Sequence, residues 1–76
     1  MLKIKDNVKL EELEEYGFIK GFIHLKMHKQ TITYVGQNKN IYINNSCWWN
    51  HEFYYCEGYD VIYDLIQAGL VEKVEE

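Results

Sequence analysis

Hydrophobic residues near the start of the chain are spaced as in a short amphipathic helix. Leu10 and Leu13 fall on one stripe of residues 10–16, and most of the other positions there are glutamates. This spacing predicts a helix with a solvated acidic face that ends at Gly17, a residue suited to a helix C-cap. Residues 2–5 alternate between apolar and polar and predict a short strand before the helix.

From Gly21 onward the pattern changes to a period of two. Within residues 21–28, isoleucine, leucine and methionine alternate with histidine, lysine and histidine. Such alternation is typical of a strand with one buried face. Lys29 and Gln30 are expected to turn the chain into a second strand, residues 31–35, which is rich in β-branched and aromatic residues.

The middle of the chain predicts further strands joined by polar turns. Residues 36–40 contain Gly, Gln, Asn and Lys and read as a turn that leads to an apolar strand at residues 41–43. After a loop rich in Asn and Ser, residues 52–56 are expected to return as another strand. Consecutive strands joined in this way predict an antiparallel meander.

A second helix is predicted near the end of the chain. Asp60 is a favoured helix N-cap residue, and Gly69 is placed to end the helix. The expected apolar face of this helix is formed by Ile62, Leu65 and Ile66.

Together these elements predict an α+β fold, in which a small antiparallel sheet, a meander, packs against two short α-helices. The chain has 76 residues, and we expect residues 1–76 to form a single compact domain. A domain of this size is near the lower limit at which a hydrophobic core alone gives useful stability. A metal ion or a partner would therefore add substantially to its stability.

The charge of the chain disfavours direct binding to nucleic acid. Twelve acidic residues stand against eight lysines, arginine is absent, and the formal net charge is −4. Without guanidinium groups the chain lacks the side chain best suited to phosphate and guanine recognition, and an acidic surface instead suits basic protein partners. No signal peptide or membrane-spanning run is recognisable, so a cytoplasmic protein is expected.

The segment between the two cysteines concentrates metal-binding side chains. Cys47, His51 and Cys56 are soft or borderline ligands spaced Cys-x3-His-x4-Cys. A tetrahedral zinc site needs a fourth ligand, for which His28 is the first candidate. The other candidates for the fourth ligand are His24, Glu57 and Asp60.

Two other interpretations of the cysteines are open. Cys47 and Cys56 suit small buried hydrophobic positions, with His51 satisfied by the backbone. Either cysteine could also pair with a histidine as a nucleophile and base, but no glycine-rich oxyanion loop accompanies them. We therefore expect no enzymatic activity.

Two groups of residues are candidates for contact with a protein partner. Trp48 and Trp49 are adjacent, so both rings cannot easily face one core, and exposed tryptophan is a favoured interface anchor. The acidic helix face is the second candidate, since it could dock on a basic groove. Its partner-binding residues are expected to be Glu11, Glu12 and Glu15, beside Glu14.

The two ends of the chain resemble known small proteins. Residues 1–8 (MLKIKDNV), 13–18 (LEEYGF) and 63–74 (YDLIQAGLVEKV) resemble uncharacterised phage and prophage proteins of low-GC Gram-positive bacteria. That group includes anti-CRISPR inhibitors. The resemblance implies an inhibitor of a host defence nuclease, a type II CRISPR effector, that acts by direct protein binding and without chemistry.

Residues 69–73 (GLVEK) suggest an alternative, because with the helix before them they look like the helix-to-wing join of winged-helix regulators. Such a regulator would bind DNA through a basic recognition face, which this acidic chain lacks. A structural phage accessory protein without inhibitor activity is the remaining alternative.

Overall fold

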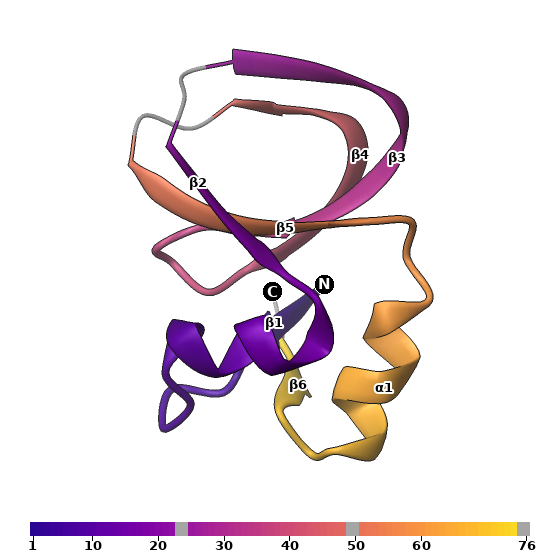
Figure 1. Cartoon of the computed structure of the whole chain (residues 1–76). Helices are drawn as coiled ribbons and strands as arrows, with labels where there is room; N and C mark the ends of the chain where they lie inside the picture. Colours follow the sequence, from indigo (N-terminus) through magenta and orange to yellow (C-terminus); the bar gives the residue numbers. More distant parts are fainter. Residues whose placement is uncertain (23–24, 49–50, 75–76) are drawn as a thin grey trace.

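An antiparallel four-stranded sheet forms the centre of the molecule in the computed structural model (Figure 1). The structure describes residues 1–22, 25–48 and 51–74. The strands of the sheet are β2 (Ile19–Phe22), β3 (Leu25–Val35), β4 (Ile41–Trp48) and β5 (Glu52–Glu57). The predicted antiparallel sheet is therefore confirmed.

The strand order differs from the predicted meander. The order is β2-β5-β3-β4, so β5 lies between β2 and β3 instead of beside β4. Phe53 and Tyr54 are neighbours on β5 and both are buried, one on each face of the sheet. A strand with apolar residues on both faces is best accommodated in the interior of a sheet, and this explains the central place of β5.

The predicted turn at Lys29 and Gln30 is wrong, because β3 runs through it as one strand of 11 residues. Its register with β4 shifts between Met27 and Ile32. A bulge of this kind bends a strand without ending it, and Figure 1 shows β3 and β4 curling together over the rest of the sheet. Met27, expected on a buried face, is 65% exposed.

The two ends of the chain form a second, smaller sheet. Strand β1 (Leu2–Ile4) pairs antiparallel with β6 (Val71–Lys73), with Leu2 opposite Lys73. The predicted strand at residues 2–5 is thus confirmed. The last hydrogen bond of the pair runs from the Val74 backbone N–H to the Met1 carbonyl, at 2.8 Å.

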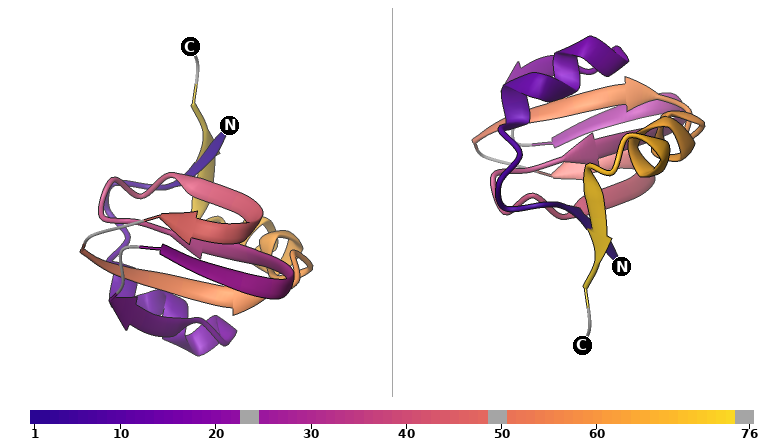
Figure 2. Two further views of the ribbon diagram at one scale, coloured as in Figure 1. Left: turned by 90° about the horizontal axis from the view of Figure 1, so that it is seen from above. Right: turned by 90° about the horizontal axis from the view of Figure 1, so that it is seen from below.

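Two helices cover one face of the four-stranded sheet (Figure 2). The first, η1 (Leu10–Tyr16), is a 3-10 helix instead of the predicted α-helix, but it ends as predicted at Gly17, whose φ is 93°. The second, α1 (Val61–Gln67), is followed by Gly69 with φ 74°. Strands outweigh helices, so the fold is a mainly β version of the predicted class.

Hydrophobic residues form one core on each face of the sheet. The main core lies between the sheet and the helices, and the second core lies on the opposite face. On α1 the buried residues are Val61 and Leu65, whereas Ile66 is 48% exposed, contrary to prediction. The main core consists of Ile4, Val8, Leu13, Phe18, Val35, Ile41, Tyr54, Val61 and Leu65. The second core consists of Ile32, Tyr34 and Phe53.

Candidate functional site

The acidic face predicted from the sequence is exposed on η1. Leu13 points into the main core and is fully buried, which turns the glutamates outward. Side chains three positions apart nearly eclipse in a 3-10 helix, so positions 11 and 14 form one row and positions 12 and 15 form another. The acidic face consists of four exposed residues, Glu11, Glu12, Glu14 and Glu15.

The row at positions 11 and 14 lies near strands β2 and β5. Burial raises the pKa of the Tyr54 hydroxyl, and the Glu11 and Glu14 carboxylates raise it further, whereas Lys20 lowers it. Lys20 pairs with Glu52 at 3.3 Å, and this partner raises the pKa of the lysine. Glu11 and Glu14 therefore lie close to the part of the sheet that carries Tyr54 and Lys20.

Strand β2 exposes apolar side chains at the edge of the sheet. It pairs with β5 and, within the described residues, with no other strand. Ile19 is 58% exposed and Phe22 is 63% exposed. Strand β2 follows η1 in the chain, and we call the acidic face together with the exposed edge of β2 the η1–β2 surface.

The two cysteines lie on strands that flank β3 from opposite sides. Cys47 on β4 is opposite Lys26, whereas Cys56 on β5 is opposite Thr33. The Cys56 thiol is free and half-buried. Burial raises the pKa of this thiol, and the nearby Glu57 carboxylate raises it further. The side chain of Cys47 lies outside the described part of the structure. The register of the sheet thus does not bring the two cysteines opposite each other.

The histidines of the predicted zinc site have different places in the fold. His51 is exposed and precedes β5, whereas Cys56 lies near the far end of that strand. Because a strand rises by about 3.3 Å per residue, the strand itself separates His51 from Cys56. His28 belongs to β3, and its side chain is outside the described part. Within the described residues, no group of three or more His, Cys, Asp or Glu side chains could hold a metal ion. Zinc binding by Cys47, His51, Cys56 and His28 stays a prediction.

The side chains of both tryptophans lie outside the described part of the structure. Trp48 is the last residue of β4 and pairs with Leu25, but its side chain is outside the described part. Trp49 lies wholly outside the described residues. Their predicted contact with a partner stays a prediction.

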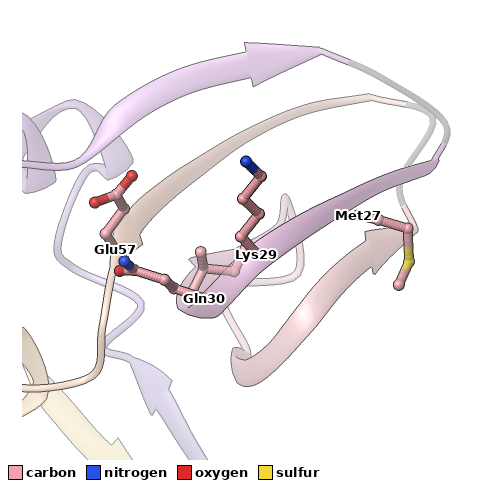
Figure 3. A pocket seen from close by; sticks show the side chains of 5 residues that line it. Met27, Lys29, Gln30 and Glu57 are labelled. Atoms are coloured by element: carbon pink, nitrogen blue, oxygen red, sulfur yellow. The ribbon is translucent and has the colours of Figure 1, made fainter.

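A cavity of about 300 Å³ lies at the bend of β3. Figure 3 shows the Lys29 amine and the Glu57 carboxylate on the same side of this bend. The cavity thus offers one amine and one carboxylate. The lining residues are Met27, Lys29, Gln30, Ile32 and Glu57.

The exposed residues of β2 were not predicted as a site. Ile19 and Phe22 are apolar and flank a lysine and a glycine, a pattern that reads as part of a core strand. The short length of the alternation and its position soon after a glycine C-cap are the signals that could have indicated an edge strand.

Across the described residues, no helix is long and apolar enough to cross a membrane.

Comparisons of the chain with protein-family models, with curated proteins and with solved structures found no match. The resemblance of the two ends of the chain to phage proteins therefore stays a prediction. The function of the protein is inferred below from its own surface.

Proposed function

We propose that the protein is an acidic binding module that docks its η1 helix on a basic surface of a partner protein. One observation carries the proposal: four carboxylates are exposed on a single short helix, and none of them forms an ion pair with another described residue. Carboxylates without internal cations are available to cations of a partner. With a net charge of −4, the chain is also attracted to a basic surface over a longer range.

The partner that we propose is a type II CRISPR effector nuclease of a bacterial host. Such nucleases hold their guide–target heteroduplex in a positively charged channel. An acidic domain that occupies part of this channel competes with nucleic acid and needs no chemistry of its own. The suggestion that the target is a defence nuclease comes from the resemblance to phage proteins, and the acidic face is compatible with it.

Cleavage of target DNA by a guide-loaded type II effector, with and without the protein, tests the proposal. The variant E11Q/E14Q/E15Q removes three charges from the acidic face but keeps Glu12, whose carboxylate accepts a 2.8 Å hydrogen bond from the Lys9 backbone N–H. We expect it to raise the half-inhibitory concentration about tenfold, which corresponds to about 1.4 kcal/mol spread over three charges. Inhibition should also weaken as salt is added.

The matched control is E57Q/D60N/D64N, which removes three exposed charges at the end of β5 and on α1 with its N-cap. We expect this variant to inhibit within about twofold of the unmodified protein, since none of the three belongs to the acidic face of η1. Equal losses for both variants would indicate a net-charge effect and not a docking face. No inhibition of several type II effectors by the unmodified protein would remove the nuclease proposal.

The DNA-binding alternative has less support. A winged-helix regulator needs three closely spaced helices, and the described residues form one α-helix and one 3-10 helix. Strand β6, which follows α1, pairs with β1 and does not form a wing hairpin. The discriminating measurement is salt-dependent binding to duplex DNA, which we expect to be negligible for the isolated protein.

A further inference from the structure

We propose that the free edge of β2 binds an extended basic segment of the partner protein by adding a strand to the sheet. The inference rests on the proposed function, because it takes the partner to be basic, and it adds how and where that partner is held. Backbone hydrogen bonds along the edge would supply affinity, and the side chains on either side would select the sequence.

The first step is that β2 offers a pairing edge. Its register with β5 runs from Ile19 opposite Tyr55 to Phe22 opposite Glu52, so one side of the strand is in use. The backbone groups of the other side face no further strand among the described residues. Exposed edges of this kind are templates for another strand.

The second step is that the usual protections of an edge strand are weak here. Natural edges carry prolines or charged side chains, lysine especially, that discourage pairing. β2 contains no proline, and the amine of its lysine, Lys20, is held by the Glu52 carboxylate at 3.3 Å. The remaining side chains are Ile19 and Phe22, which are more than half exposed, and a glycine.

The third step concerns the two faces of the edge. Gly21 lies against Phe53 of the second core, so Ile19, two residues away, is on the same face of the sheet. Lys20 is on the opposite face, beside Tyr54 of the main core and within the field of Glu11. The acidic face therefore flanks one side of the edge, on which Phe22 also lies by the same alternation, and Ile19 flanks the other side.

An added strand also points alternate side chains to opposite faces. Lysine or arginine at every second position would meet the carboxylates of η1, while apolar residues between them would lie beside Ile19. The segment that fits the edge is therefore an alternating basic and apolar strand. Charge complementarity selects this occupant.

A second copy of the chain fits the edge less well. Pairing of β2 with β2 of another molecule would bring together two chains of net charge −4, each with its own acidic face. The other edge strand, β4, provides a comparison: Ile43 there is 53% exposed, but its exposed neighbours Asn44 and Asn45 are uncharged. Of the two described edges of the four-stranded sheet, the β2 edge is the one that combines an apolar residue with carboxylates from a neighbouring helix.

The test uses the whole chain and a short synthetic peptide of alternating lysine and valine. A control peptide carries proline in place of each valine, which keeps the charge but removes every second backbone N–H donor and fixes φ at about −65° there. We expect the valine peptide to bind at least about tenfold more tightly. It should also slow amide hydrogen exchange at residues 19–22 and shift their NMR signals, without comparable effects on β4.

Two protein variants complete the test. Ile19→Lys places a charge on the β2 edge and should weaken binding of the valine peptide about tenfold. Ile43→Lys adds the same charge to an equally exposed isoleucine on β4 and should leave binding within about twofold. Both positions are exposed, so both variants should fold, and their unfolding midpoints verify this.

Three results would overturn the inference: equal affinity for the two peptides, equal effects of the two variants, or a homodimer that Ile19→Lys dissociates. If the peptides bind equally but E11Q/E14Q/E15Q still relieves nuclease inhibition, edge pairing fails while the proposed function stands. If the valine peptide pairs with β2 but no effector is inhibited, the nuclease proposal fails while the edge remains a binding site.

Discussion

The backbone of Gly21 lies against the ring of Phe53. A Cβ added at position 21 would be 2.8 Å from Phe53 Cζ and 3.0 Å from Cε1, closer than side-chain carbons normally approach. The ring is 1% exposed and belongs to the second core, so it has little room to move. Glycine on an edge strand thus leaves space for an aromatic ring from its neighbour.

We expect Gly21→Ala to lower the free energy of unfolding by about 1–3 kcal/mol, because the methyl group overpacks the ring. Urea denaturation of the single variants and of Gly21→Ala in a Phe53→Leu background measures the effect. Since the smaller leucine leaves room, the cost of the alanine should fall below about 0.5 kcal/mol in that background. If Gly21→Ala costs the same stability in the Phe53→Leu background, contact with the Phe53 ring is not the cause of the loss.

Lys39 links the turn between β3 and β4 to the N-terminal loop through side-chain hydrogen bonds. Its amine donates to the carbonyl oxygens of Asp6 at 2.8 Å and of Val8 at 2.6 Å. Lys39→Met keeps the length of the side chain but leaves these acceptors without their donor, so we expect a loss of about 1–3 kcal/mol of stability. Lys9→Met, which removes the same charge from an exposed side chain, should cost less than about 0.5 kcal/mol.

Lys39 has φ 67°, and it is the non-glycine residue with positive φ within the described part of the chain. The methionine variant retains this backbone conformation, so the comparison isolates the amine. If Lys39→Met lowers the free energy of unfolding no more than Lys9→Met does, the hydrogen bonds of the Lys39 amine do not stabilise the fold.

Tyr54 should make the protein less stable in alkali. Its pKa is raised above the ordinary value of 10.0, mainly by burial, so the folded protein keeps this proton at pH values where the unfolded chain has lost it. The folded state then binds more protons, and the free energy of unfolding falls as pH rises above about 10. Below that pH the contribution of Tyr54 is fully present.

Unfolding in urea at about pH 9 and about pH 11 measures this dependence. We expect Tyr54→Phe to reduce the fall in stability between the two pH values. Tyr63→Phe is the matched control, since Tyr63 is 66% exposed, and it should leave the fall unchanged. Identical pH profiles for the two variants would show that burial of the Tyr54 hydroxyl has no such effect.

Metal analysis distinguishes the roles of the two cysteines. The sequence predicts that Cys56 is a zinc ligand, so Cys56→Ser should lower the zinc content of protein purified without added metal from about one equivalent to none. An unchanged zinc content would leave Cys56 as a residue that packs against the main core, opposite Thr33 in the sheet register. Absence of zinc from the unmodified protein would remove the metal site altogether.

Elements defined by local chemistry were predictable from the sequence. Leu13 and Gly17 specify an amphipathic turn and its end, and the structure has both. The type of helix was not predictable in the same way, because the spacing of two leucines three apart is compatible with a 3-10 helix as well as with an α-helix.

Long-range pairing was not predictable from local patterns. The aromatic run after an Asn- and Ser-rich loop predicts a strand at residues 52–56 but does not say which strands it joins. The burial of Phe53 and Tyr54 on opposite faces decides its central place. Likewise, the polar pair Lys29 and Gln30 suits a turn and also a bulge. The η1–β2 surface was half predicted: its carboxylates follow from helical spacing, whereas exposed Ile19 resembles a core residue in sequence.

The pairing of β1 with β6 determines how the molecule would respond to a pulling force. Met1 and Val74 lie at the same end of this antiparallel pair, since Leu2 is opposite Lys73. Force applied across these two residues would open the hydrogen bonds one after another, beginning with the bond between them, instead of loading them all at once. The small sheet should therefore unzip at low force and release Ile4 from the main core before the larger sheet is strained.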